Sequence, residues 1–244
     1  MWFWNKKHTI AASGILQDAV DHHSHILPGV DDGVETMDEA LRILATYEAM
    51  GIKELWLTPH IMEDIPNTPQ KLATRFEELK AAYIGNITLH LAAEYMIDNN
   101  LLKLLKAREE VAHNSLLPIG AAGKHILVET SYFNPPMRFK ETLRQIKSLG
   151  YYPLLAHPER YMYMDNDEYR RLREEGVKFQ LNLVSLAGGY GAVVRKKAMW
   201  LLTNGLYSVA GSDLHSEDAI EFITKCKLSK LDIEQVKQLL QNKI

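Results

Sequence analysis

Histidine and acidic residues recur where short apolar runs end along this 244-residue chain. Runs rich in aliphatic and β-branched residues are typical of buried strands. The residues at or just after the ends of these runs are Asp21, His23, His25, His60, Glu94, Glu129, His157, Asp213 and His215. Because imidazole and carboxylate groups bind divalent transition metals, the pattern predicts a metal site assembled from distant parts of the chain.

Spacing supports this prediction in two places. His23 and His25 lie two residues apart, as do Asp213 and His215. Residues two apart on an extended strand point to the same face, so each pair can face one metal region. One His-x-His pair is weak evidence, and the prediction rests on the joint pattern. The remaining histidines, which are His8, His22, His90, His113 and His125, are expected to be structural.

Two turn segments add candidate residues. Leu27–Gly33 reads LPGVDDG, in which Asp32 is chosen over Asp31 as a metal ligand; the alternative is that both acids belong to a helix entry. The segment HPER places Arg160 three residues after His157. A guanidinium at that rim can bind two phosphate oxygens, and the alternative is a salt bridge with a neighbouring acid such as Glu159.

The charges of the candidate ligands indicate the chemistry. Four carboxylates, from Asp32, Glu94, Glu129 and Asp213, give a charge of −4, which two divalent ions would neutralise and three would bring to +2. A positive site attracts a phosphate dianion, and clustered metal ions lower the pKa of bound water. The ligand set therefore favours metal-assisted hydrolysis of a phosphoester and leaves Mn²⁺, Fe²⁺ and Zn²⁺ open.

The elements that would position these residues alternate between strand-like and helix-like periodicity. Seven β/α units are expected, and they indicate an α/β fold with a parallel sheet. Strands are expected in 19–25, 54–60, 87–95, 125–131, 153–160, 178–185 and 207–213, and helices near 36–50, 69–83, 99–112, 138–149, 166–175, 191–204, 217–226 and 231–242. In barrels of such units the active site lies at the carboxyl ends of the strands, where the candidate ligands fall.

Composition excludes several classes of protein. The net charge of −3 gives no broad basic surface for nucleic acid. The single cysteine, Cys226, allows no intrachain disulfide, and no apolar stretch is long enough to span a membrane. We expect a cytoplasmic protein. Trp2, Phe3 and Trp4, followed by Lys6 and Lys7, suit a contact with the chain's own domain, a second subunit in a homo-oligomer, or a membrane surface.

Seven motifs in order resemble one known family. They read DHHSHILPGVDDG, LTPHI, LAAEYMID, ILVETSYFNPP, LLAHPER, LNLVSLAGGYG and VAGSDLH, from about Asp21 to His215. The chain resembles the polymerase-and-histidinol-phosphatase (PHP) superfamily, and within it the bacterial capsule- and exopolysaccharide-type metal-dependent protein-tyrosine phosphatases. The resemblance implies a distorted (β/α)7, TIM-like barrel, with residues 1–18 as an extension and 19–244 as one domain.

The resemblance also implies a ligand scheme for three divalent ions, usually manganese. His23, His25, Glu129 and Asp213 would hold the first ion, Glu129 would bridge to a second that uses His157, and the third would lie among Asp32, His60, Glu94 and His215. Arg160 would bind the phosphate. Relatives often carry a second arginine after the D-x-H motif, but SDLHSEDAIEF has none, so Arg138 is a candidate replacement.

The implied substrate is the phosphotyrosine tail of a membrane-bound bacterial autokinase that controls polysaccharide export. Cys226 has no arginine six residues on, which excludes a phosphocysteine mechanism and favours attack by metal-bound hydroxide, with His157 as one candidate acid. The residues Tyr132, Phe133, Met137, Tyr161 and Tyr163 could stack on the substrate ring or pack at the rim. Alternatives are a small-molecule phosphatase, such as one for histidinol phosphate, a phosphodiesterase acting on DNA ends, and a non-catalytic regulator of polysaccharide export.

Overall fold

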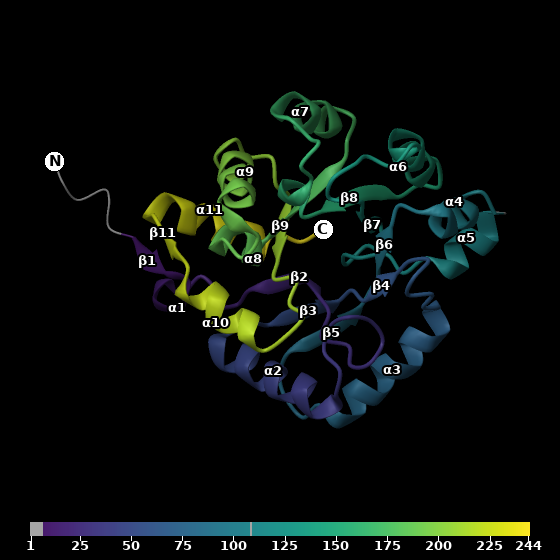
Figure 1. Ribbon diagram of the computed structural model, residues 1–244. Helices are drawn as coiled ribbons and strands as arrows, with labels where there is room; N and C mark the ends of the chain where they lie inside the picture. Colours follow the sequence, from purple (N-terminus) through teal and green to yellow (C-terminus); the bar gives the residue numbers. More distant parts are fainter. Residues whose placement is uncertain (1–6, 108) are drawn as a thin grey trace.

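Strands and helices alternate through most of the computed structural model, which describes residues 7–107 and 109–244 (Figure 1). The strands are β1 (His8–Thr9), β2 (Val20–Ser24), β3 (Glu54–Leu57), β4 (His60–Ile61), β5 (Thr88–Leu91), β6 (Glu94–Met96), β7 (His125–Glu129), β8 (Tyr152–Ala156), β9 (Lys178–Asn182), β10 (Val209–Gly211) and β11 (Lys227–Leu228). The helices are α1 (Ile10–Ser13), α2 (Met37–Met50), α3 (Pro69–Ala82), α4 (Asn99–Leu105), α5 (Glu109–Ser115), α6 (Phe139–Ser148), α7 (Asn166–Glu174), α8 (Leu183–Ala187), α9 (Gly191–Thr203), α10 (Asp218–Lys225), α11 (Lys230–Gln241) and the 3₁₀ turn η1 (Pro158–Arg160).

Parallel strands form two sheets. One has the order β10-β9-β8-β7-β6-β4 and the other the order β2-β3-β5. A parallel bridge, Ser24 to Leu214, links the two sheets beside β2 and β10. The fold is therefore α/β with parallel sheets, as the alternating pattern predicts.

Several expected strands end earlier than the sequence pattern indicates. The run 54–60 divides into β3 and β4 because Pro59 has no N–H to donate to a neighbouring strand. The run 87–95 also divides into two strands, β5 and β6. After β8 the chain turns into η1, and after β9 the Asn182 side chain accepts hydrogen bonds from the amides of Val184 and Ser185, which starts α8. Each interruption lies next to a candidate ligand or to a residue that supports one.

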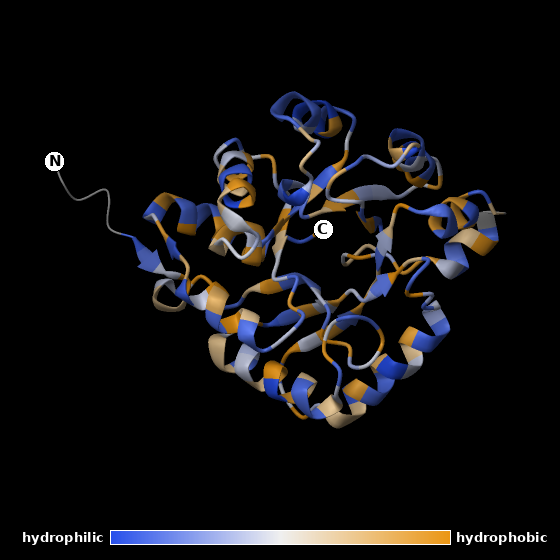
Figure 2. Cartoon of the chain, in the orientation of Figure 1, coloured by the Kyte–Doolittle hydropathy of each residue, from blue (hydrophilic) through white to orange (hydrophobic). Residues whose placement is uncertain are grey.

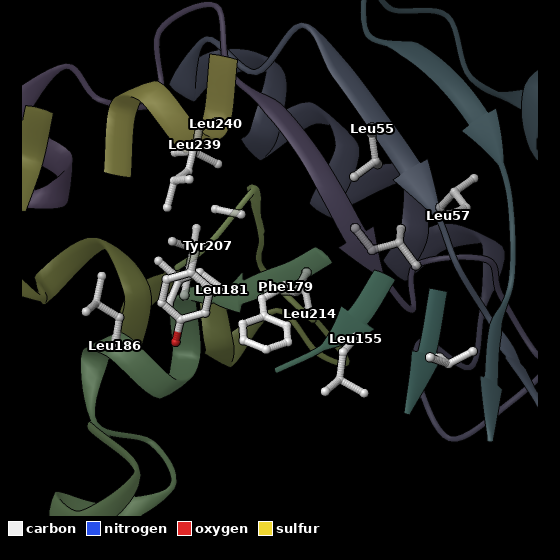
Figure 3. Packing of buried hydrophobic residues seen from close by; sticks show 14 of the residues in the cluster. Leu55, Leu57, Leu155, Phe179, Leu181, Leu186, Tyr207, Leu214, Leu239 and Leu240 are labelled. Atoms are coloured by element: carbon white, nitrogen blue, oxygen red, sulfur yellow. The ribbon is translucent and has the colours of Figure 1, made fainter. Parts of the chain in front are cut away.

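Two clusters of buried apolar residues pack against the sheets. A large cluster lies between the strands and the helices; Figure 3 shows Leu239 and Leu240 of α11 in this cluster with Leu181 and Phe179 of β9. Residues alternate along a strand, so Gln180 and Asn182 point to the other face of β9. Figure 2 shows mostly hydrophilic residues on the outer helix α7. The second cluster includes Val20, Trp56, Ile119, Leu127, Leu154 and Val209.

The expected N-terminal extension packs on the rest of the chain over its described part. β1 pairs with β11, with His8 opposite Leu228, and both Ile10 and Ile15 are buried in the large cluster. The aromatic segment with Trp2, Phe3 and Trp4 lies outside the described residues. Within the described ranges, no helix is long and apolar enough to cross a membrane.

Candidate metal centre

The nine expected metal ligands converge at the carboxyl ends of the parallel strands. Glu94, at the start of β6, lies at their centre. Its Oε2 is 3.2 Å from Nε2 of His23, 3.4 Å from Nε2 of His25 and 3.2 Å from Nδ1 of His60. Its Oε1 is 3.1 Å from Nε2 of His157. One fully buried carboxylate thus faces four imidazoles.

The ligand atoms gather in three groups. Within each group they lie within 4.8 Å of one another; the groups are His25, Asp32, His60 and His215; His23, Glu94, His157 and Asp213; and His60, Glu94 and Glu129. This grouping differs from the scheme that the resemblance implies. Glu94 takes the central position assigned to Glu129: in the register of the two strands it pairs with Leu127, two residues before Glu129 on β7. Glu129 lies 3.1 Å from His60 and 3.9 Å from His157.

The side chains fit a group of divalent cations. Buried polar atoms in proteins nearly always form hydrogen bonds. Yet Glu94 Oε2, His60 Nδ1 and His157 Nδ1 are buried and form no hydrogen bond among the described residues. The Nε2 atoms of His23 and His25 face each other at 3.0 Å. Ligand atoms that converge without hydrogen-bond partners are typical of a site whose partner is a metal ion.

Asp31 orients one of these histidines. Its Oδ2 accepts a hydrogen bond from Nδ1 of His25 at 2.8 Å and from the amide of His60 at 3.0 Å, and its Oδ1 accepts from the amide of Gly33. Such a partner fixes the ring and leaves Nε2 free to bind a metal. Asp32, chosen as the ligand, lies 3.4 Å from His60 and 3.6 Å from His215. The two adjacent acids therefore have different roles.

Two amides on β9, which the sequence analysis did not single out, support the centre in the same way. Gln180 Oε1 lies 3.0 Å from Nδ1 of His23 and accepts from the amide of His157. Asn182 Nδ2 donates to Oδ2 of Asp213 at 2.6 Å. The signal that could have found them is their alternation on the strand that precedes GGYG, which places both on the face of the ligands.

The backbone is strained at two of the candidate ligands. His157 has φ 33° and Asp213 has φ 54°, in the left-handed region that residues with a Cβ seldom adopt. Both follow the end of a strand. Strain of this kind persists when the surrounding structure holds it, and it concentrates at functional sites. The positive φ values turn both side chains toward the centre of the ligand cluster.

Opposite charges compensate one another in this centre. Burial alone would lower the pKa of His23, but the carboxylates of Glu94 and Asp213 raise it to about 9. Burial would raise the pKa of Glu94 and of Asp213, but the neighbouring histidines hold both pKa values below their usual range. The carboxylates are therefore ionised at neutral pH and available as ligands.

Arg160 faces the same space. Seven of the nine expected ligands, all except His23 and His25, line a cavity of about 300 Å³ together with Tyr132, Tyr190 and Arg160. The guanidinium lies between the rings of Tyr132 and Tyr190, 4.2 and 4.1 Å from their centroids, and donates to Oδ2 of Asp213 at 3.0 Å. The alternative partner, Glu159, is instead buried against the Tyr207 hydroxyl and the Asn182 amide. A cation held this way can bind an anionic substrate.

Some expected residues lie elsewhere. Arg138 does not line the metal cavity; it precedes α6, with its Nε 3.8 Å from Glu141. Tyr161 is fully buried and donates to the carbonyl of Ala156, so its ring cannot stack on a substrate. Asp21 accepts hydrogen bonds from the amides of His23 and Ser212 and belongs to none of the three groups.

Cys226 is buried, and burial raises the pKa of its thiol, which agrees with its exclusion as a nucleophile.

The fold and the site define a class: an α/β protein with a cluster of candidate histidine and carboxylate ligands at the carboxyl ends of parallel strands, next to the largely buried Arg160. Residues 19–238 match the family described as "Capsular polysaccharide synthesis, CpsB/CapC". The chain therefore belongs to the CpsB/CapC family, as the resemblance of its motifs indicates.

Two relatives illustrate the similarity. The tyrosine-protein phosphatase CpsB of Streptococcus pneumoniae is 27% identical over 211 residues, which are 82% of this chain and 84% of that protein. The tyrosine-protein phosphatase YwqE of Bacillus subtilis is 26% identical over 225 residues, which are 88% and 84% of the two chains. A solved structure from work on YwqE and CpsB, described as unique metal-dependent tyrosine phosphatases, shares the fold with a TM-score of 0.74 at 23% identity, covering 92% of this chain and 95% of that chain.

Proposed function

We propose that this protein is a metal-dependent phosphatase that hydrolyses phosphotyrosine in proteins. The observation that carries the proposal is the convergence of histidine and carboxylate side chains, three of whose buried ligand atoms form no hydrogen bond among the described residues, beside a cavity that also holds Arg160. Two relatives that each cover most of this chain are named tyrosine-protein phosphatases, which supports the choice of substrate.

The finer parts of the proposal concern the cofactor and the fold. We take the nine side chains to hold three divalent ions, with Mn²⁺ first and Fe²⁺ or Zn²⁺ as alternatives; the three ligand groups support this number. When bound, such ions activate water as a nucleophile and polarise phosphate oxygens. We further take the two sheets to be the wall of a distorted (β/α)7 barrel, formed by residues 19–244 as one domain.

Arg160 has the role of binding the phosphate in this proposal. Its guanidinium is mostly buried and is held between the rings of Tyr132 and Tyr190, so little side-chain freedom is lost when it binds an oxyanion. Planar N–H donors match two phosphate oxygens, and their charge stabilises the charge that develops on phosphorus oxygens during transfer. Tyr132 and Tyr190 thereby fix the direction in which Arg160 presents its donors.

His157 has a second role beside that of a ligand. Its Nε2 faces Glu94, and its Nδ1 forms no hydrogen bond among the described residues. A nitrogen of this ring could hold the proton that the leaving tyrosinate needs. We take the physiological substrate to be the tail of a bacterial tyrosine autokinase. This substrate, the cytoplasmic location and a contact through the N-terminus stay predictions.

A comparison of substrates tests the proposal. Metal-stripped protein is assayed with a phosphotyrosine peptide, a phosphoserine peptide and histidinol phosphate, before and after Mn²⁺ is resupplied. We expect Mn²⁺-dependent hydrolysis with a preference for phosphotyrosine. Activity on histidinol phosphate alone would keep the metal site and overturn the substrate; no activity on any of the three would favour a non-catalytic regulator. Ions that bind the folded state at 100 times their Kd also stabilise it by about 2.7 kcal/mol, so stripping should lower the Tm.

A further inference from the structure

Exposed apolar side chains gather on two loops beside the metal cavity. The loop between β7 and α6 carries Phe133, which is 73% exposed, and Met137, which is fully exposed. The loop after η1 carries Met162, which is 46% exposed. Large apolar side chains grouped on a surface are typical of a binding site. We call Phe133, Met137 and Met162 the rim patch.

The two loops are fixed to each other. The amide of Met162 donates to the carbonyl of Tyr132 at 2.7 Å. The Tyr163 hydroxyl lies 3.4 Å from Oγ1 of Thr130, and the ring of Tyr161 stacks between those of Tyr132 and Tyr163, with centroid distances of 6.3 and 6.0 Å. The rim patch is therefore held on a packed base, which lowers the entropy lost when a partner binds.

A second groove lies beside this base. Tyr132 lines the metal cavity, and Tyr163, two rings farther along the stack, lines a separate groove of about 480 Å³. Pro135, Pro136, Met137 and Phe139 line its other parts. A free phosphotyrosine would fill the metal cavity alone, whereas a polypeptide that places its phosphotyrosine there would lay its neighbouring residues on the groove.

The charges at the groove indicate which polypeptide fits. Lys140 lies 3.1 Å and Arg171 lies 3.0 Å from Glu168, and Arg138 lies 3.8 Å from Glu141. The cations that line the groove are therefore paired within the protein, and no surplus of either sign is left to attract a strongly charged segment. The charged side chains of the groove therefore balance one another, and the apolar side chains of Phe133 and Met137 are exposed beside them.

We propose that the rim patch and this groove bind apolar residues next to the phosphotyrosine of a protein substrate, an inference that rests on the function proposed above. Arg138 then belongs to the wall of the substrate groove, although it lies outside the metal cavity. The occupant is an extended peptide segment that carries apolar side chains within a few residues of the phosphotyrosine.

The test compares two substrates on Mn²⁺-loaded protein. One is a ten-residue peptide with leucine and phenylalanine beside its phosphotyrosine, and the other is free phosphotyrosine. In a variant that combines Phe133→Ser with Met137→Ser, we expect the ratio of kcat/KM for the peptide to kcat/KM for free phosphotyrosine to fall about tenfold. Ile84→Ser is the matched control, because Ile84 is 99% exposed in the turn between α3 and β5, away from both loops.

The outcomes separate the two proposals. An unchanged ratio in the double variant, or an equal fall in the Ile84→Ser control, would overturn the docking surface and leave the phosphatase proposal intact. A wild-type protein that hydrolyses neither substrate would overturn the phosphatase proposal itself. A peptide with glycine and serine beside its phosphotyrosine should be a poorer substrate for the wild type and should lose little in the double variant; an equal loss for both peptides would contradict selection of apolar residues.

Discussion

The two ends of the parallel strands are built on opposite principles. At the carboxyl ends, buried imidazoles and carboxylates face one another around Glu94, and several of their polar atoms lack hydrogen bonds. Toward the amino ends, Val20, Leu127, Leu154 and Val209 pack in an apolar cluster. The same strands run through both regions. On β7, for example, Leu127 belongs to the apolar cluster and Glu129, two residues later, belongs to the polar site at the carboxyl ends.

This contrast shows how the chain accommodates a costly site. Charges that are buried near one another destabilise a fold unless a partner compensates them. Apolar packing at the other end of the same strands supplies stability that does not depend on a metal. We therefore expect substitutions at the carboxyl ends to change activity and metal binding, and substitutions toward the amino ends to change the free energy of unfolding.

The largest effect is expected from Glu94→Gln. The amide keeps the size of the side chain but removes the charge that faces four histidines. Phosphatase activity should fall by about 1000-fold or more, to the level of metal-free protein, and the bound metal should decrease. Glu77→Gln, on an exposed position of α3, is the control. Wild-type turnover in Glu94→Gln would remove Glu94 from the centre of the site.

The opposite result is expected from Leu127→Ala. Leu127 is fully buried in the apolar cluster, and removing such a side chain costs about 2–5 kcal/mol of the free energy of unfolding. Denaturant titration should show this loss, while kcat per folded molecule stays within about threefold of the wild type. If kcat falls together with stability, the two ends are coupled and the contrast between them is wrong.

Asp31→Asn should have an intermediate effect. The carboxylate of Asp31 accepts the Nδ1 proton of His25, and loss of such a partner typically weakens metal binding by about 10–100-fold. Isothermal titration with Mn²⁺ measures this affinity. Asp32→Asn serves as the comparison, because Asp32 is a proposed ligand. If both variants bind Mn²⁺ as the wild type does, neither acid takes part in the site.

The smallest effect concerns His125 at the start of β7, near the amino ends. Burial, together with Lys178 and His22, lowers its pKa from 6.5 to about 4. The unfolded chain therefore binds this proton more readily, so the free energy of unfolding falls as the pH drops from 6.5 toward 4, and His125 contributes nothing to this slope above 6.5. In His125→Gln the loss of stability between pH 7.5 and pH 5 should be smaller by about 2 kcal/mol. Parallel pH curves for the two proteins would contradict this assignment.

Much of this arrangement could be predicted from the sequence, because strand ends are marked by local chemistry. Runs of apolar residues that stop at His23, Glu129 or Asp213 indicate both the strand and its end. The helices expected near 36–50, 138–149, 166–175 and 191–204 are also found, and a glycine with a positive φ follows each of them: Gly51, Gly150, Gly176 and Gly205. In place of the one helix expected over 99–112, the structure has two shorter helices, α4 and α5.

The rest depends on three-dimensional contacts. Glu94 and Glu129 both end apolar runs, and only the register of β6 against β7 places Glu94 among four histidines. Asp31 and Asp32 are neighbours of one residue type, and the turn that orients them is fixed by hydrogen bonds to His25, His60 and Gly33. For Gln180 the sequence offers only its alternation with Asn182 along the strand, because its contacts with His23 and His157 exist only once β9 lies beside β8.

The left-handed backbone at His157 and Asp213 has a consequence for engineering. Each such residue costs on the order of 1–3 kcal/mol, and glycine adopts the same backbone without this cost. Glycine would, however, also remove a buried side chain and, at position 213, would leave the Arg160 guanidinium without its carboxylate partner. Relief of the strain is therefore no route to a more stable protein at either position. Screens for a more robust version of this protein should hold these two positions fixed and draw their gains from the amino ends of the strands.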